Sequence, residues 1–227
     1  MYDLYIANKN YSSWSLRPWA LMRELKIEFR EHLVPFGEES SWQSYRKISP
    51  SGKVPCLIDG DTVVWDSLAI AEYLAERHPG VWPVSAGARA WARSAAAEMH
   101  SGFGELRSRC SMNCGLRIRL KEIPAGLEHD LARLGTLWND GLRRFGGPFL
   151  AGDAFTAVDA FYAPVAFRIQ TYGLALDTAA APYAGHLLGT RALREWYADA
   201  LEETLRDPTH DDGISQVGQV LEDLRAQ

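Results

Sequence analysis

The apolar pattern of this chain changes once along its length, near residue 78, and this change limits the folds that the chain can adopt. Before that point, short apolar runs with strand character alternate with stretches of helical period. We expect strands at 3–7 and 30–34, helices at 15–25 and 68–77, a hairpin that joins 57–58 to 62–65, and a short helical or irregular passage at 42–46. Strands that alternate with helices and end in a hairpin favour an α/β layer.

The second part of the chain has a different pattern. The segment from His78 to Ser85 contains two prolines and a glycine, which predicts a linker. After it we find only helical periods, and we expect helices at 88–107, 127–145, 157–171 and 192–205. The sequence therefore predicts a domain at 1–78, a linker at 79–86 and an all-α domain at 87–227. The polar, turn-rich end, residues 207–227, is expected either to be mobile or to fold back over the site.

Composition narrows the class of protein. A chain of 227 residues, 47% of them hydrophobic, can bury a sizeable core. Its net charge of -5 argues against a nucleic-acid surface, which normally carries a basic field. There is no apolar run of about eighteen residues and no basic segment before the first strand, so we expect neither a membrane span nor a signal peptide. These features predict a soluble, cytoplasmic protein.

The three cysteines, Cys56, Cys110 and Cys114, form neither a C-x-x-C pair nor a disulfide framework. Cys110 and Cys114 lie one helical turn apart if their segment is helical, a spacing that a metal or redox site can use. Two soft ligands fall short of the four that structural zinc takes, so we expect no metal. Cys56 follows a proline directly and is predicted to be a small buried apolar residue.

Two hydroxyls, Ser12 and Ser13, stand between the first predicted strand and the first predicted helix. The N-terminus of a helix presents unpaired N–H groups and partial positive charge, which favour an anion such as a thiolate or a carboxylate. A serine pair at this place is also an ordinary helix cap.

Two further motifs follow in order. Val54 and Pro55 end a loop and begin a short apolar strand. A proline at the start of a strand has no amide donor there, so the neighbouring backbone groups can face a ligand. Tertiary contacts can also hold such an X-Pro bond in the cis form. Asp66 and Ser67 then begin an apolar helix, which makes a second helix start suited to an anion.

Taken together, the serine pair, the Lys53-Val54-Pro55 motif and the helix start at Asp66 resemble the glutathione-binding half of a cytosolic glutathione transferase of the serine type, zeta-like or theta-like. In the second half, residues 149–159 resemble the capping box of that family's helical domain, and a proline at position 164 falls inside the following helix. The resemblance covers roughly residues 1–205. It implies a thioredoxin-like α/β domain followed by an all-α domain, the glutathione transferase fold.

The resemblance also implies roles for individual residues. Ser12 aligns with the serine that activates the thiol of glutathione in the zeta-like class, with Ser13 as second choice and Tyr11 as third. This chain has Trp14 where that class has a cysteine, a departure that argues against the maleylacetoacetate isomerase activity of that class. The absence of a cysteine before Gly52 likewise argues against the mixed-disulfide chemistry of omega-like relatives.

The remaining parts of glutathione have candidate partners in the same motifs. The resemblance assigns backbone groups of Val54, beside Pro55, to the cysteinyl part and assigns Asp66 and Ser67 to the γ-glutamyl end. The following helix amides suit a carboxylate and the aspartate suits an ammonium group. Lys53 is a candidate partner of the glycine carboxylate, although an exposed loop lysine is equally an ordinary surface residue.

The electrophile is expected to bind between the domains. His100, Phe103 and Arg107 have i, i+3 and i+7 spacing, so they would share one face of the predicted helix 88–107 and line one pocket together with Tyr11 and Trp14. The other interpretation is that the histidine is a packing residue and the arginine a surface cation.

The function predicted from the resemblance is conjugation of glutathione, as co-substrate, to small electrophiles, or isomerisation of such electrophiles, in detoxification. Alternatives are a non-catalytic glutathione-binding or scaffold protein, a glutathione-dependent peroxidase, and a maleylacetoacetate isomerase-like enzyme. The family also implies a homodimer. We expect a small-molecule partner and no nucleic acid or membrane.

Overall fold

The computed structural model describes residues 1–37, 41–176 and 180–226. The N-terminal domain contains, in chain order, β1 (Tyr2–Ile6), α1 (Ser13–Glu24), β2 (Phe29–Leu33), α2 (Ser41–Arg46), β3 (Cys56–Asp59), β4 (Thr62–Trp65) and α3 (Ser67–Ala75). The strands form one sheet in the order β2-β1-β3-β4, in which β1 and β2 are parallel and the other neighbours antiparallel. The predicted alternation of strands and helices, closed by a hairpin, is confirmed.

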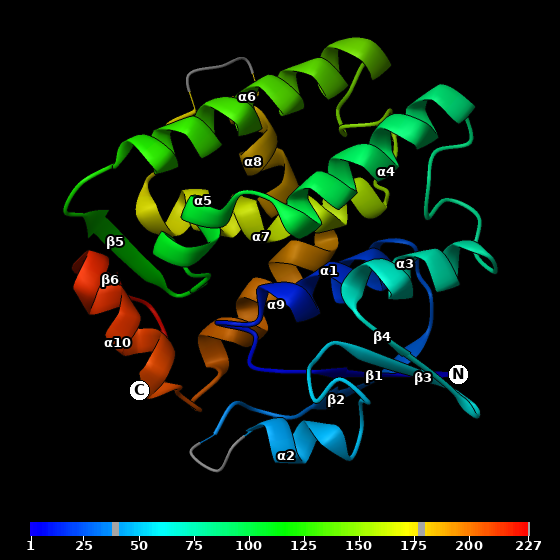
Figure 1. The fold of residues 1–227 in the computed structure, drawn as a ribbon, viewed down its shortest axis with the longest axis horizontal. Helices are drawn as coiled ribbons and strands as arrows, with labels where there is room; N and C mark the ends of the chain where they lie inside the picture. The colour runs from blue at the N-terminus through cyan, green and yellow to red at the C-terminus, as the bar shows by residue number, and fades with distance from the viewer. Residues whose placement is uncertain (38–40, 177–179, 227) are drawn as a thin grey trace.

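The second domain is built mainly of helices. Its elements are α4 (Ala86–Ser101), α5 (Gly104–Arg109), β5 (Leu116–Leu120), α6 (Ala125–Phe145), α7 (Ala157–Tyr172), α8 (Ala181–Leu188), α9 (Arg191–Glu202), α10 (Pro208–Val217) and β6 (Gly218–Asp223). Figure 1 shows α4 to α8 above α1 and α3, while α2 lies on the other side of the sheet. No helix in the described part of the chain is long and apolar enough to cross a membrane.

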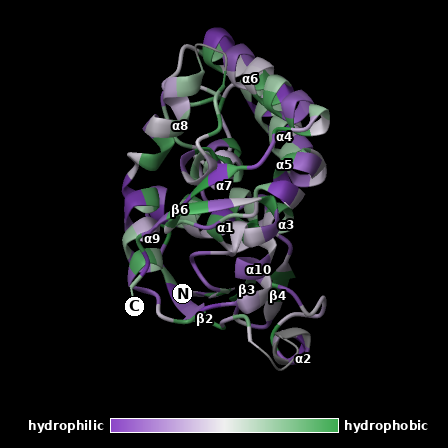
Figure 2. Cartoon of the chain, turned by 90° about the vertical axis from the view of Figure 1, so that its left-hand side faces the viewer, coloured by the Kyte–Doolittle hydropathy of each residue, from purple (hydrophilic) through white to green (hydrophobic). Residues whose placement is uncertain are grey.

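The core runs through both domains and is centred on α7. This helix is buried over almost its whole length and packs against α1, α4 and α8. The outer helix α6 is amphipathic: it buries Leu134 and Trp138 and alternates between hydrophilic and hydrophobic residues along its length (Figure 2).

The predicted capping box at the start of α7 is present. Thr156 is the N-cap residue, and the Asp159 carboxylate accepts hydrogen bonds from the Thr156 amide at 2.9 Å, the Leu150 amide at 3.0 Å and the Tyr183 hydroxyl at 2.7 Å. Asp159 is fully buried, and this desolvation raises its pKa. These donors satisfy a carboxylate that would otherwise be costly to bury, and they tie α7 to the preceding loop and to α8.

The prediction of a mainly helical second domain is confirmed, but it missed helices α8 and α10 and the antiparallel pair of β5 and β6. In β5, the apolar Leu116 and Ile118 are buried, whereas Arg117 and Arg119 point the other way, which is the alternation of a strand. This pattern was present in the sequence, but it was too short to stand out between helices. The partner strand is about a hundred residues further along the chain and is mostly exposed, so its own pattern is weak.

The predicted continuous helix at 88–107 is wrong. Helix α4 ends at Ser101, and a separate helix, α5, begins at Gly104. Gly102 allows this break, because a Cβ at that position would lie 2.8 Å from the carbonyl oxygen of Glu98, and Phe103 adopts a left-handed conformation at φ 55°.

The cysteine pair also differs from the helical interpretation. Cys110 caps the C-terminus of α5, and Cys114 lies in the loop before β5, so the two are not one helical turn apart. Both side chains are buried, as is Cys56, and burial raises the pKa of the Cys56 and Cys110 thiols to about 11. Within the described residues, no group of three or more His, Cys, Asp or Glu side chains is arranged to hold a metal ion.

The C-terminal segment folds back onto the rest of the molecule. Figure 1 shows α10 and β6 beside β5, with the C-terminus near the loop that precedes α1. Arg225 holds this segment in place: its Nη1 lies 3.0 Å from the Tyr11 hydroxyl oxygen and 2.9 Å from Asp211 Oδ1. Of the two expectations for residues 207–227, the structure shows the folded-back one for 207–226.

Candidate active site

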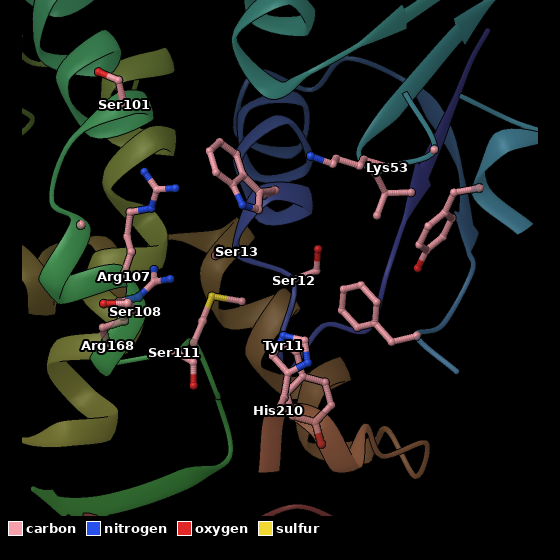
Figure 3. Close-up of a pocket in the computed structure, with 17 residues that line it drawn as sticks. Tyr11, Ser12, Ser13, Lys53, Ser101, Arg107, Ser108, Ser111, Arg168 and His210 are labelled. Carbon is pink, nitrogen blue, oxygen red and sulfur yellow. The ribbon is translucent and has the colours of Figure 1, made fainter. Parts of the chain in front are cut away.

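A cavity of about 690 Å³ opens between the two domains at the N-terminus of α1. One wall, with Phe36 and Lys53, comes from the N-terminal domain, and the facing wall, with Arg107 and Arg168, comes from the helical domain. Figure 3 shows Ser12 between these two walls. The chain therefore places a hydroxyl and a helix N-terminus at the base of a cavity large enough for a peptide and a small second substrate.

The serine pair occupies two different positions at the start of α1. Ser12 is the N-cap residue, and its Oγ accepts from the Ser15 amide at 3.4 Å and donates to Ser15 Oγ at 2.7 Å. Ser15 is fully buried, and its hydroxyl oxygen accepts from the Ala7 amide at 3.2 Å. Ser13 is the first residue of the helix, and its hydroxyl has no hydrogen-bond partner among the described residues.

Tyr11, the third candidate for contact with sulfur, has its hydroxyl in another network. It donates to Asp211 Oδ2 at 3.3 Å and accepts from Arg225. Desolvation, together with the nearby Asp211 charge, raises the pKa of Tyr11 to about 12. This hydroxyl is therefore already occupied in holding the C-terminal segment, although the ring lines the cavity.

The second predicted anion site has the expected local geometry. The Val54–Pro55 peptide bond is cis. Asp66 is the N-cap of α3, and its carboxylate accepts from the Leu68 amide at 2.8 Å. The Asp66 backbone lies at φ 73° and ψ 136°, a conformation that costs about 1–3 kcal/mol in a non-glycine residue and is found mostly at functional sites. Ser67, which follows it, is buried.

Arg17 was not among the site residues predicted from the sequence. The side chain is buried, stacks on Trp14 with its Cζ 4.1 Å from the ring centroid, and donates from Nη1 to Ser67 Oγ at 3.4 Å. Its Nε has no partner, and no carboxylate in the described part of the chain lies within ion-pair distance. Desolvation, and then the charges of Arg168 and Arg107, lower the pKa of Arg17 to about 9.

A buried guanidinium without a counter-ion is costly unless a ligand supplies the negative charge. Arg17 lies beside Ser67 at the N-terminus of α3, so the two helix starts and this cation converge on one region. A carboxylate bound there would satisfy the unpartnered Nε. The sequence signal for this role was an arginine inside the otherwise apolar first helix.

Two more arginines face the cavity from the helical domain. Arg168 is 5% exposed and donates to the carbonyl oxygens of Cys110 at 2.7 Å and Pro164 at 3.3 Å, and desolvation lowers its pKa to about 10. Arg107 donates to the His100 carbonyl at 3.1 Å and lies over the Trp14 ring at 5.0 Å. Neither arginine forms an ion pair with a described carboxylate, so this wall is cationic.

The predicted site residues separate into two groups. The cavity is lined by seven of them: Tyr11, Ser12, Ser13, Trp14, Lys53, Val54 and Arg107. Asp66 and Ser67 lie next to this region, at the start of α3.

The prediction that His100, Phe103 and Arg107 share one helix face is wrong, because the break after Ser101 puts them on different elements. Phe103 packs in the core with its ring centroid 6.5 Å from that of Tyr162. His100 lies beside the start of α3: its Nε2 is 3.4 Å from Asp66 Oδ2, and desolvation lowers its pKa.

Other cavity residues were not predicted. Phe36 follows β2, Met112 lies in the loop after α5, and His210 comes from the first turn of α10. His210 was in the segment for which the sequence offered only the choice between a mobile end and a folded-back one.

The comparisons with known proteins agree with this geometry. Residues 11–77 match the family described as glutathione S-transferase, N-terminal domain. The chain is also 27% identical over 181 residues to a probable maleylacetoacetate isomerase of Caenorhabditis elegans, an alignment that covers 77% of this chain and 81% of the relative. Residues 11–77 therefore form a glutathione S-transferase N-terminal domain, and over most of its length the chain is similar to glutathione S-transferases and maleylacetoacetate isomerases.

Other relatives match over different lengths. A dichloromethane dehalogenase of Methylorubrum extorquens is 39% identical over 61 residues, so the alignment spans 26% of this chain and 21% of the dehalogenase. A glutathione transferase homologue from Burkholderia, solved with bound glutathione, has a TM-score of 0.65 at 20% identity, covering 88% of this chain and 97% of that one. This likeness shows the shared fold, so the predicted glutathione transferase fold is confirmed.

Proposed function

We propose that this protein is a glutathione S-transferase that binds glutathione in the cavity and activates its thiol through the Ser12 hydroxyl for reaction with small electrophiles. The observation that carries the proposal is the linked pair of hydroxyls, Ser12 and Ser15, at the N-terminus of α1 and at the base of the cavity. The alternative donor is Ser13, whose hydroxyl has no partner in the described part of the chain.

The hydroxyl pair can stabilise a thiolate without moving the backbone. The Ser12 proton turns from Ser15 toward the bound sulfur, and the Ser15 hydroxyl then donates to Ser12 Oγ across the same 2.7 Å. A thiol of pKa about 8.5 is only a few per cent ionised at neutral pH, and about 2.7 kcal/mol of differential stabilisation lowers that pKa by about two units. One charge-assisted hydrogen bond of about 1.5–3 kcal/mol supplies most of this.

The rest of the peptide has partners around the sulfur. We infer that the γ-glutamyl carboxylate binds at Ser67 and the first amides of α3, where Arg17 supplies the missing counter-charge. Asp66 suits the neighbouring ammonium group, and the backbone of Val54 suits the cysteinyl part. Lys53 lies on the same wall of the cavity, where the glycine carboxylate would end.

The buried Arg17 also argues against the non-catalytic scaffold reading. A protein that kept this fold only for assembly would gain stability by replacing an unpaired buried cation with an apolar side chain. Retention of the cation together with the serine pair is the arrangement expected of a chain that binds an anionic co-substrate.

A second candidate reaction is isomerisation of an unsaturated acid, and the cationic wall of Arg107 and Arg168 favours it. In such a reaction the thiolate adds to a carbon–carbon double bond, the bond rotates and the thiolate leaves again. Relatives from Caenorhabditis elegans and Dictyostelium discoideum are named as maleylacetoacetate isomerases. An electrophile with a free carboxylate should have a kcat/KM about 10–100-fold above its methyl ester, and equal values would refute this second candidate.

The thiol activation is tested by titrating the protein with glutathione at several pH values and following the ultraviolet absorbance of the thiolate. We expect a bound-thiol pKa well below about 8.5 in the wild type and a higher one in Ser12→Ala. Tight binding without a change in the thiol pKa would favour a binding protein. No binding at all would mean that the cavity serves another ligand.

We also propose that the enzyme is a homodimer, as the family implies. Sedimentation at micromolar concentration tests this, and a lone species of 25.3 kDa would contradict it.

A further inference from the structure

We propose that His210, supplied by the C-terminal segment, is the base that accepts the thiol proton of glutathione in this cavity, and that Asp207 positions it. The inference rests on the proposed glutathione-dependent function and adds to it a residue from α10, an element that the glutathione-binding motifs do not include.

The histidine ring is held on both faces. It stacks on Tyr11 with centroids 5.1 Å apart and an interplanar angle of 27°, and on Phe36 with centroids 5.2 Å apart and an angle of 26°. Tyr11 directly precedes Ser12, so this stack places the imidazole next to the start of α1 and within the cavity (Figure 3).

Hydrogen bonding to Asp207 determines which ring nitrogen is available. Nδ1 of His210 pairs with Asp207 Oδ2, while Oδ1 of the same carboxylate caps α10 by accepting from the Thr209 amide at 3.3 Å. A neutral imidazole that donates from Nδ1 carries its lone pair on Nε2. Nε2 has no partner among the described residues, and the ring lines the cavity, so this nitrogen is available to a ligand.

The C-terminal segment is anchored well enough to hold a base in position. Arg225 bridges Asp211, one residue after His210, and the Tyr11 hydroxyl, and it also pairs with Asp223 at the end of β6. Pairing of β6 with β5 ties the other end of the segment to the helical domain. These contacts connect α10 to the same loop that carries the serines.

The proposed step needs only glutathione, His210, Ser12 and water. The S–H bond breaks, its electron pair stays on sulfur, and the proton binds to Nε2 of His210. Ser12 donates a hydrogen bond to the new thiolate, but a serine hydroxyl is far too weak a base to hold the proton at neutral pH, so the two residues have different tasks. After sulfur has bonded to the electrophile, the imidazolium releases its proton to water and the base is restored.

The surrounding charges act in opposite directions on the imidazolium. The Asp207 carboxylate pairs directly with the His210 ring and stabilises its positive charge. Asp211, the next residue of α10, has a second negative charge, but its ion pair with Arg225 neutralises much of that charge. Arg107 and Arg168 on the far wall and Lys53 on the near wall oppose a positive ring but favour the thiolate. The stacked Phe36 and Tyr11 add no charge, and the Tyr45 hydroxyl, which packs behind Phe36, donates to the carbonyl oxygen of Val34. After proton transfer from the thiol to His210, the positive imidazolium is paired with Asp207, and the negative thiolate lies in the cavity lined by Arg107, Arg168 and Lys53.

The experiment compares His210→Gln with His129→Gln, a control at an exposed position on α6. With glutathione and an activated aromatic halide, His210→Gln should lower kcat/KM about fourfold near pH 6, below the bound-thiol pKa that Ser12 sets, and the loss should disappear above about pH 8, where that thiol is ionised without a base. The dissociation constant of glutathione should change by less than about threefold, because the imidazole acts on the proton and not on the peptide. Asp207→Asn should lower kcat/KM about twofold near pH 6 with the same pH dependence.

Chemical rescue separates a base from a shape-filling residue. Added imidazole should restore part of the activity of His210→Ala, because the vacated space between Tyr11 and Phe36 has the size of the missing ring. A loss in His210→Gln that is equal at every pH, without rescue of His210→Ala, would overturn the proposal and leave the histidine as a wall of the cavity. A wild-type protein that neither binds nor uses glutathione would instead refute the proposed function itself.

Discussion

Ser12→Ala is the substitution that tests the proposed chemistry most directly, because it removes two interactions of known size. The first is the helix cap, in which Ser12 Oγ accepts from the Ser15 amide at 3.4 Å, and its loss lowers the free energy of unfolding by about 1 kcal/mol. The second is the hydrogen bond to the bound thiolate, worth about 1.5–3 kcal/mol. Divided by about 1.36 kcal/mol for each pKa unit, the second loss raises the thiol pKa by about 1–2 units.

This shift has a direct effect on rate. A thiol pKa that rises from about 6.5 to between about 7.5 and about 8.5 lowers the thiolate fraction at neutral pH about 3–25-fold, so turnover at saturating glutathione should fall about 3–25-fold in Ser12→Ala. Binding to immobilised glutathione should persist, because the substitution leaves in place Arg17, Asp66 and Ser67, the proposed partners of the other end of the peptide. The assay is the ultraviolet absorbance of bound thiolate against pH, with urea unfolding of the free protein measured in parallel.

Ser13→Ala is the matched control. The Ser13 hydroxyl has no described partner, so its removal should change stability by less than about 0.5 kcal/mol and leave the thiol pKa where it is. Ser15→Ala should raise the thiol pKa by less than Ser12→Ala does, because Ser15 acts on sulfur only through Ser12. An unchanged thiol pKa in Ser12→Ala with a raised one in Ser13→Ala would show that Ser13 is the donor. Unchanged values in both would refute activation by a serine.

Three further outcomes are expected from the burial of charged and polar groups. Arg17→Met should raise the free energy of unfolding of the ligand-free protein by about 1–2 kcal/mol and weaken glutathione binding about 10–100-fold. Urea unfolding measures the first change and calorimetry the second. A lower free energy of unfolding, or an unchanged affinity for glutathione, would contradict this prediction. Asp159→Ala should lower the free energy of unfolding by about 3–5 kcal/mol, because it leaves three buried donors unpaired, and a loss below about 1 kcal/mol would refute the role of the capping box. Cys56, Cys110 and Cys114 should not react with a thiol reagent at neutral pH until the chain unfolds, since burial raises their pKa values. The thiols of the unfolded chain ionise near about pH 8.5, whereas those of the folded chain stay protonated up to about pH 11. The free energy of unfolding should therefore fall as the pH rises from about 8.5 toward about 11. A free energy of unfolding that does not change over this range would contradict the raised thiol pKa values.

The sequence alone predicted the elements whose signals are short in range. Strands β1 to β4 and helices α1, α3, α6, α7 and α9 were predicted within a few residues of their observed ends, because each carries its own periodicity and its own start or stop residue. The serine pair, the cis-proline loop and the Asp66 helix start could be placed for the same reason. Each of these motifs acts on backbone groups only a few residues away, as the capping contacts of Ser12 and Asp66 show.

The tertiary structure decided the features that depend on contacts between distant parts of the chain. The break after Ser101 put His100 beside Asp66 and Phe103 in the core, although their spacing suited a single helix. Pairing of β5 with β6 joins segments about a hundred residues apart, and no local pattern encodes that register.

The same holds for the charges that make the site work. Arg17 and Arg168 look like surface residues in the sequence, and only the packing of α7 against α1 removes them from water and leaves Arg17 without a counter-ion. His210 enters the cavity because Arg225 and β6 return the end of the chain to Tyr11. Local sequence determines where a helix begins and which hydroxyl caps it, whereas burial, and with it the electrostatics of the site, is a property of the whole chain once it has packed.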